Sequence, residues 1–366
     1  MTHISITSVP VPAGLAGPDA VDFLAVAELL NAQQQEFWGN NDFYAPPQAQ
    51  LAGRGSTPTR RRELLAARMG TEPDAAIIGV AQLNLPLTDN LHTGTVNVVV
   101  APVARRQGVG TALFAAAAKL ASAAGRRMLM AETDHLGGGP AGTGEDSSGT
   151  ENAAAFIPHD AAAAFAAGLG FRLELVDRVS VLELEGYDAE AVLGQAARTA
   201  GPGYELEFWR GACPEELVDA YARLRQKMST DAPLGGLELA EEAWDAERVR
   251  EAEGKARGMD AEVLVTAVRH VATGELAGHT VLEVFRNNPA VAYQDDTLVL
   301  DAHRGNRLGM LLKAANLEKL RKAIPEACRV YTWNAEENRY MLAINEQLGF
   351  AAVGYSGEWQ ADLSAG

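Results

Sequence analysis

Two short segments of the chain combine arginine and glycine in a pattern suited to binding a diphosphate. Glycine lets the backbone approach an anion closely, unpaired N–H groups at a helix start point at phosphate oxygens, and arginine adds charge and paired donors. The spacing differs from a Walker A loop and from the dinucleotide-binding GxGxxG turn, which disfavours nucleoside triphosphates and dinucleotides. The first segment consists of Arg105, Arg106, Gln107, Gly108, Val109, Gly110 and Thr111.

The second segment lies in a weak internal repeat of the first. Residues 96–114 and 295–313 align without a gap, so that Arg105 falls on Arg304 and Gly110 on Gly309, whereas Arg307 takes the place of Gly108. Each half also has a later Leu-Gly-Phe, at 169–171 and 348–350. Such a repeat predicts two related structural units. The second segment consists of Arg304, Gly305, Asn306, Arg307, Leu308, Gly309 and Met310.

Hydrophobic periodicity places both segments between a strand and a helix. The fold class we expect is mixed α/β, with strands and helices in both halves. Helices are predicted at 19–37, 110–124, 214–227 and 309–323, the last ended by Pro325. Strands are predicted at 75–85, 94–101, 126–133, 262–269, 279–285, 297–300 and 329–332.

The length of the chain favours two domains. The Gly/Pro-containing segment TAGPGY, at 199–204, predicts a boundary between an N-terminal domain at 1–198 and a C-terminal domain at 204–366. The first copy of the repeat is longer, and its extra residues, 135–152, are rich in Gly, Ser and Thr. We expect an exposed loop there, because the segment offers little apolar surface to bury.

A strand followed by the motif (R/Q)xxGx(G/A) and then by a helix resembles the pyrophosphate loop of the GNAT acetyltransferase superfamily. In that family an Asn also precedes a Gly-Phe pair by a fixed interval, which Asn338 satisfies; His159 stands at the equivalent place of the first copy. The tandem arrangement resembles two-domain actinobacterial members such as mycothiol synthase. The resemblance implies two GNAT-like domains, each a mixed, mostly antiparallel sheet flanked by helices.

The resemblance further implies acetyl-CoA as cosubstrate and no metal. It assigns coenzyme contacts to the main chain at Val98, Val100 and Val299, and to Asn338 and Asn345 in the second half. Many members protonate the leaving thiolate with a Tyr that corresponds to Ala166 and Asn345 here. Neither can act as an acid, so the proton must come from another group, or one domain is not catalytic.

Carboxylates at strand ends are the candidate general bases for an amine nucleophile. They are Glu132, with Asp134 beside it, in the first half, and Glu283, Asp295 and Asp296 in the second. Residues 36–47, which follow the first predicted helix and include Trp38, Asp42 and Phe43, are a candidate lining for the acceptor cleft.

The function we expect is acetyl transfer to a primary amine of a small molecule by direct attack on the thioester, with one domain catalytic and the other degenerate. The first half has the better diphosphate loop, and the second has the better Asn and Gly-Phe segment. The resemblance gives the second half a narrow preference as the catalytic one. Non-catalytic acyl-CoA binding and protein-lysine acetylation remain alternatives.

Composition limits the partners. A formal charge of −17 argues against a protein that coats nucleic acid, and no apolar run is long enough to cross a membrane. The two cysteines have no metal-ligand spacing, and the N-terminus has no signal-peptide pattern. We therefore expect a cytoplasmic protein without a metal site. The oligomeric state is left open.

Overall fold

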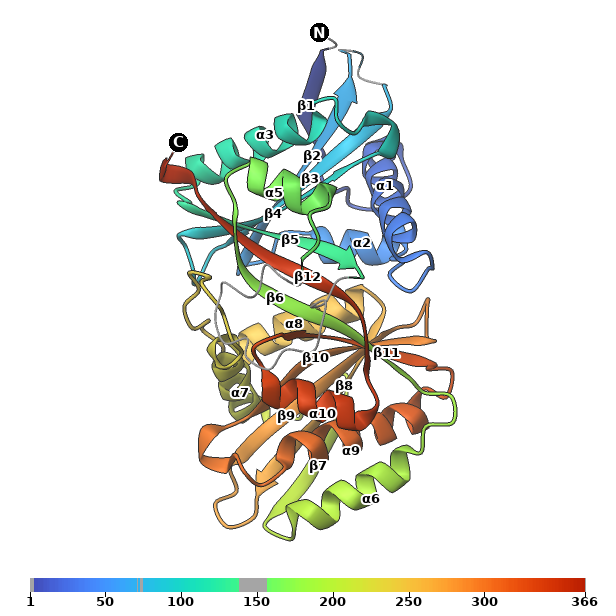
Figure 1. Ribbon diagram of the computed structural model, residues 1–366, viewed down its shortest axis with the longest axis vertical. Coiled ribbons are helices and arrows are strands. Elements are labelled where there is room, and N and C mark those ends of the chain that lie inside the picture. Colours follow the sequence, from blue (N-terminus) through green and yellow to red (C-terminus); the bar gives the residue numbers. More distant parts are fainter. Residues whose placement is uncertain (1–2, 71, 73–74, 138–156, 366) are drawn as a thin grey trace.

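The computed structural model describes residues 3–70, 72, 75–137 and 157–365. A 12-stranded sheet runs through the molecule in the order β1-β2-β3-β4-β5-β12-β6-β11-β10-β9-β8-β7 (Figure 1). The strands are β1 (Ile4–Ser8), β2 (Arg60–Met69), β3 (Ile77–Pro86), β4 (Thr93–Val100), β5 (Met128–Leu136), β6 (Arg172–Glu183), β7 (Tyr204–Arg210), β8 (Ala261–His270), β9 (Leu276–Phe285), β10 (Val291–Val299), β11 (Arg329–Ala335) and β12 (Ala351–Asp362).

Helices cover the sheet on both faces. The α-helices are α1 (Val21–Trp38), α2 (Pro47–Arg54), α3 (Val109–Ala123), α5 (Ala161–Gly168), α6 (Ala189–Ala200), α7 (Val218–Asp231), α8 (Ala246–Gly258), α9 (Leu308–Ala323) and α10 (Arg339–Leu348). The strand pairs β4-β5 and β10-β11 are parallel, and the other pairs are antiparallel. The predicted class, a mixed and mostly antiparallel sheet flanked by helices, is confirmed. Within the described residues, no helix combines the length and apolarity needed to cross a bilayer.

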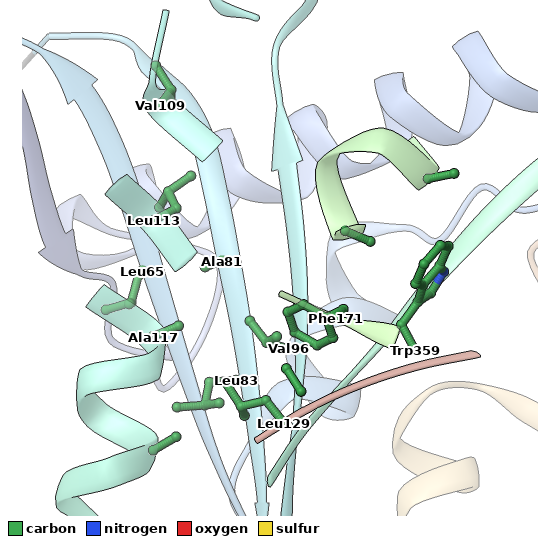
Figure 2. Packing of buried hydrophobic residues seen from close by; sticks show 14 of the residues in the cluster. Leu65, Ala81, Leu83, Val96, Val109, Leu113, Ala117, Leu129, Phe171 and Trp359 are labelled. Atoms are coloured by element: carbon green, nitrogen blue, oxygen red, sulfur yellow. The ribbon is translucent and has the colours of Figure 1, made fainter. Parts of the chain in front are cut away.

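Alternation along the strands separates two cores in the first half. On one face, Phe23 and Val26 of α1 pack with Leu64 of β2. On the other, Leu113 and Ala117 of α3 pack against the neighbouring strands (Figure 2). The second half repeats this arrangement, with α7 on one face and α9 on the other.

The elements around the two diphosphate segments were predicted well. The predicted strand 94–101 is β4, and the predicted helices 110–124 and 309–323 are α3 and α9. The predicted strand 297–300 is the end of a longer β10, which includes two aspartates at a register shift between Gln294 and Thr297. The predicted loop 135–152 was wrong at its start, because β5 continues to Leu136; residues 138–152 lie outside the described residues.

The final strands of the two halves are exchanged. β12, at the end of the chain, lies between β5 and β6, whereas β6 of the first half also pairs with β11 of the second (Figure 1). α6, whose last residues extend past the predicted end of the first domain at 198, packs on α9 through Ala196 and Leu311. The boundary at 198/204 stays a prediction, and both β6 and α6 lie with second-half elements.

In each half, the parallel strand pair separates after a few residues. β4 pairs with β5 only from Thr93 to Thr95, and β10 pairs with β11 only from Val291 to Gln294. Beyond these residues, the facing edges of β4 and β5, and of β10 and β11, are no longer hydrogen-bonded to each other. Each half therefore contains a gap in the sheet directly before its diphosphate loop.

The exchange predicts that the first half does not fold alone. A fragment of residues 1–198 lacks β12, so β5 and β6 present unpaired edges. We expect this fragment to be unfolded or aggregated by circular dichroism and gel filtration, and to fold when mixed with a fragment of residues 204–366. A monomeric 1–198 fragment with cooperative unfolding would contradict the exchange.

Candidate active site

The two diphosphate loops have the same backbone conformation, but glycine stands at different positions in them. In the first loop Arg106 (φ 62°) and Gly108 (φ 85°) are left-handed, and in the second Gly305 (φ 84°) and Arg307 (φ 59°) are. Glycine adopts this conformation freely, whereas arginine is strained there. Each loop therefore keeps one strained arginine, and α3 and α9 begin directly after the second left-handed residue.

The first arginine of each loop ties it to the strand before it and to a helix. Arg105 donates from Nε to the last carbonyl of β4 (3.1 Å) and pairs with Glu36 of α1. Arg304 donates in the same way to the last carbonyl of β10 (3.1 Å) and pairs with Asp231 of α7. These contacts position the loops; the phosphate contacts predicted for both side chains stay predictions.

The main chain at the start of α3 has the geometry of a candidate anion site. The first bond across the helix start runs from the Ala112 N–H to the Gly108 carbonyl (3.0 Å). The preceding N–H groups, on Val109, Gly110 and Thr111, have no acceptor within the helix and lie at its positive end. An anion is stabilised at such a position.

A cavity of about 950 Å³ adjoins this anion site. It is lined by Gln33, Gln34, Glu36 and Phe37 of α1, by Val96, Asn97, Val98, Val99 and Val100 of β4, by Ala104, Arg105, Arg106, Gly108, Val109, Gly110, Thr111 and Phe114 of the loop and α3, by Ala131, Glu132, Thr133 and Asp134 of β5, and by Asp160, Ala161, Ala162, Phe165, Ala166, Leu169 and Phe171 around α5.

The cavity passes through the sheet. Ala131 and Thr133 lie on the face covered by α3 and α5, because they alternate with buried Leu129 in that core. Glu132 and Asp134 lie on the opposite face, which α1 covers. All four line the same cavity, and the separation of β4 from β5 provides the opening between the faces.

Carboxylates gather where the cavity reaches the α1 face. Glu132 accepts a hydrogen bond from Ser356 Oγ (2.8 Å). Burial and the charge of Glu132 raise the pKa of Asp134 to about 7. Burial and neighbouring carboxylates raise the pKa of Asp177 on β6 to about 7 and raise that of Glu358 on β12 as well. Since β6 and β12 are the exchanged strands, both halves build this acidic face.

The candidate bases of the second half form a separate group. Asp295 and Asp296 both pair with Arg225 of α7, at 3.2 and 2.7 Å. Although burial opposes it, Arg225 and His279 hold the pKa of Asp296 below its usual value. Burial and Asp295 raise the pKa of Glu283 to about 7. Burial and the charge of Asp296 raise the pKa of Asp295. Asp296 is thus a poor proton acceptor, whereas Asp295 and Glu283 are the stronger second-half candidates.

A buried lysine distinguishes the second half. Phe114 of α3 packs edge-on against Phe171 with ring centroids 5.5 Å apart, beside the cavity. The repeat places Lys313 of α9 at the position of Phe114, with Nζ 5.5 Å from the centre of the Phe350 ring. Lys313 is 1% exposed, its Nζ has no hydrogen-bond partner among the described residues, and burial lowers its pKa to about 7.

The two asparagines predicted to contact coenzyme make hydrogen bonds within the second half of the protein. Asn338 caps α10 by accepting from the Met341 N–H (3.2 Å). Asn345 is 2% exposed and donates to Asn334 Oδ1 (2.6 Å). In the first half the capping residue is Asp160 rather than the predicted counterpart His159, which is exposed.

Other predicted coenzyme residues of the second half also have partners within the protein. Asn306 donates to Tyr204 and to the His303 carbonyl, and Leu308 and Met310 pack in apolar clusters. In the first loop Gln107 turns back to the Val103 carbonyl (2.9 Å).

The segment proposed as an acceptor lining has two parts. Its first residues, including Glu36, line the cavity. Further on, Asp42 accepts from Tyr331 (2.7 Å) and pairs with Arg329, while Phe43 stacks on Trp38. This second part packs the first half onto the second.

Several cavity residues were missed from the sequence. Phe114 falls in the predicted helix 110–124 without any motif to mark it, and no element was predicted around Phe165. Thr133 and Asp160 lie on either side of the long insertion, so no local motif joins them. The available signal for Thr133 was the alternation of side chains between the two faces of the predicted strand 126–133. This alternation places Thr133 on the face opposite to its acidic neighbours.

Comparison with known proteins identifies the class. Residues 23–137 match the acetyltransferase (GNAT) family. A tandem GNAT protein from the clavulanic acid biosynthesis pathway, solved without acetyl-CoA, superposes with a TM-score of 0.75 and 26% identity over 99% of each chain. No curated protein shows a significant match to the chain.

Two further structures share the fold at lower identity. A GCN5-related glucosamine N-acetyltransferase region of a fungal multi-domain β-N-acetylglucosaminidase gives a TM-score of 0.64 at 12% identity, over 98% of this chain and 38% of that one. A GCN5-related N-acetyltransferase from Sphaerobacter thermophilus gives a TM-score of 0.59 at 14% sequence identity, over 98% of this chain and 96% of that one. The chain is therefore a tandem GNAT-fold protein whose first half carries an acetyltransferase-family domain.

Lys313 predicts a stability change with a defined pH dependence. Its pKa is about 7 in the folded protein, against the usual 10.5 of a lysine side chain, so the unfolded state binds more protons between these pH values and stability rises with pH there. We expect Lys313→Met to raise the free energy of unfolding by about 1–3 kcal/mol at pH 7 and by less at pH 9.5, measured by urea unfolding. Lys119→Met, on the exposed side of α3, is the control; an equal gain at both pH values would contradict this assignment.

Proposed function

We propose that the protein transfers an acetyl group from acetyl-CoA to a primary amine of a small molecule, and that transfer takes place in the first-half cavity. The observation that carries the proposal is one cavity joining the anion site of α3 to carboxylates on the opposite face of the sheet. Coenzyme enters from the face of α3 and α5, and the amine enters from the face of α1. The two meet in the gap between β4 and β5.

The chain offers suitable groups for each part of the coenzyme. The N–H groups at the start of α3 bind the pyrophosphate. Val98, Val100 and Phe114 provide an apolar channel for the pantetheine arm. Beyond Thr95, β5 no longer pairs with β4, so backbone N–H groups at this edge are available to stabilise the developing oxyanion.

The acidic face suits a cationic amine and its deprotonation. Carboxylates from β5, β6 and β12 attract an ammonium ion and raise its local concentration. Asp134 is the base we assign, because its pKa of about 7 lets it accept a proton near neutral pH. Glu132 has a hydrogen bond from Ser356 and raises the pKa of Asp134 by its charge.

The cavity leads us to place catalysis in the first half, against the narrow sequence preference for the second. Lys313 occupies the position of the cavity residue Phe114, and Arg307 occupies that of Gly108. In this proposal the second half supplies β12 and the acidic residue Glu358, and it is not itself a transfer site. The likeness to a tandem GNAT protein from a small-molecule biosynthesis pathway supports a small-molecule acceptor.

A matched pair of variants separates the two loops. Gly108 and Gly305 have φ values of 85° and 84°, and no atom lies within 4 Å of a Cβ added at either. Gly108→Glu and Gly305→Glu therefore impose similar strain, but only the first places a carboxylate in the proposed pyrophosphate site. We expect Gly108→Glu to abolish thiol release from acetyl-CoA and coenzyme-induced thermal stabilisation, and Gly305→Glu to retain both.

The wild-type protein is the reference for this pair. At 100 times the dissociation constant, bound coenzyme stabilises the folded state by about 2.7 kcal/mol. Absence of any stabilisation of the wild type, or loss of activity in Gly305→Glu alone, would refute the proposal. Stabilisation without turnover over a panel of amines would support acyl-CoA binding alone.

The base assignment predicts a pH profile. Asp134 accepts a proton only as the carboxylate, which predominates above its pKa of about 7, so kcat should rise as pH increases through about 7. We expect Asp134→Asn to lower kcat about 100-fold and to remove this rise. Glu283→Gln, which alters an acid of similar pKa in the second half, is the control and should retain the wild-type profile.

A further inference from the structure

A chain of hydrogen bonds connects the cavity to a buried histidine. Thr133 Oγ1 lies 2.7 Å from His135 Nε2, and His135 Nδ1 lies 2.7 Å from Asp160 Oδ2. Trp359 of the exchanged strand β12 donates from Nε1 to Thr133 Oγ1 (2.7 Å). The His135 side chain is fully buried, whereas Thr133 and Asp160 line the cavity.

The side chains of Thr133, His135 and Asp160 keep these hydrogen bonds whether His135 is neutral or protonated. With neutral His135, Nδ1–H donates to Asp160, and Nε2 accepts from the Thr133 hydroxyl. With protonated His135, Nε2–H donates to Thr133, which then accepts two bonds, and its own hydroxyl proton is free to point elsewhere. A proton can therefore pass between His135 and the cavity through Thr133 without movement of a heavy atom.

Asp160 is held in place by the start of α5. Its Oδ1 accepts from the N–H groups of Ala162 and Ala163, at 2.9 and 3.0 Å, at the start of α5. These two bonds fix the carboxylate so that its other oxygen, Oδ2, lies against His135 Nδ1.

Thr133 lies in the same cavity as Ala166, which stands where many GNAT members have the Tyr that protonates the leaving thiolate. Ala166 lines the cavity on α5, where its methyl group has no proton to give. Thr133 lines the same cavity from β5, on the face covered by α3 and α5, where the proposed coenzyme enters. The Thr133 hydroxyl is thus on the side of the leaving sulfur, opposite the base Asp134.

We infer that Thr133 donates the proton that the leaving thiolate requires, and that His135 and Asp160 resupply it; this inference rests on the proposed function. As the amine nitrogen bonds to the carbonyl carbon, the carbon–sulfur bond breaks and the sulfur takes the Thr133 proton. Thr133 takes the Nε2 proton of His135. The amine loses its proton to Asp134, and before the next cycle Asp134 releases this proton to solvent while His135 regains one by way of the cavity. Thr133 is the catalytic residue here, and His135 and Asp160 are positioning residues.

Dependence on the leaving group distinguishes proton donation from a structural role. A thiolate of low basicity leaves without an acid, so loss of the relay should matter for acetyl-CoA and much less for an acetyl thioester of an acidic aryl thiol. We expect His135→Gln and Thr133→Val to lower kcat/KM for acetyl-CoA about 100-fold, and to lower it less than about 5-fold for S-acetyl thiophenol. Both variants should keep coenzyme-induced thermal stabilisation.

Two further variants serve as matched controls. Thr133→Ser retains the hydroxyl and should keep most of the activity with acetyl-CoA. Trp359→Phe removes one bond to Thr133 but leaves the relay intact, and should lower activity only a few-fold. Equal losses with both thioesters, or full activity of Thr133→Val, would overturn the relay while leaving the proposed function standing. A wild type that binds no coenzyme would overturn both.

Discussion

The separation of β4 from β5 after Thr95 is the constraint on which the site depends. Parallel strands bonded along their full length would close the sheet at this point. Their divergence leaves a gap that reaches both faces, and the same strand then leads into the loop that starts α3. One backbone feature therefore provides the cavity, the free edge of β4 and the helix terminus to which we assign the pyrophosphate.

The second half has the same backbone with different chemistry. β10 and β11 also diverge, and Arg304 repeats the anchoring contacts of Arg105. However, where Phe114 lines the first-half cavity, the second half has Lys313, whose Nζ is buried with no hydrogen-bond partner in the part of the chain that the structure describes. Burying a charge without a partner carries a large desolvation cost. In this account the second copy is retained for its contribution to the shared sheet, since β12 completes the neighbourhood of β5.

The sequence predicted the parts of this fold that are encoded locally. The gapless alignment of 96–114 with 295–313 placed both loops, and periodicity found α3 and α9 to within a residue or two. The exchange of β6 and β12 could not be predicted, because either strand could pair with either half and only long-range packing decides. The site was predicted in part: Glu132 and the first loop line the cavity, whereas Thr133, His135 and Asp160 come together only through tertiary structure.

The most direct measurement is a crystal structure of the protein with coenzyme A, combined with calorimetry for the number of molecules bound. The account predicts one coenzyme per chain, with its pyrophosphate at the N–H groups of Val109 to Thr111 and its thiol between β4 and β5. Coenzyme bound between β10 and β11 alone, or bound equally in both halves, would contradict it.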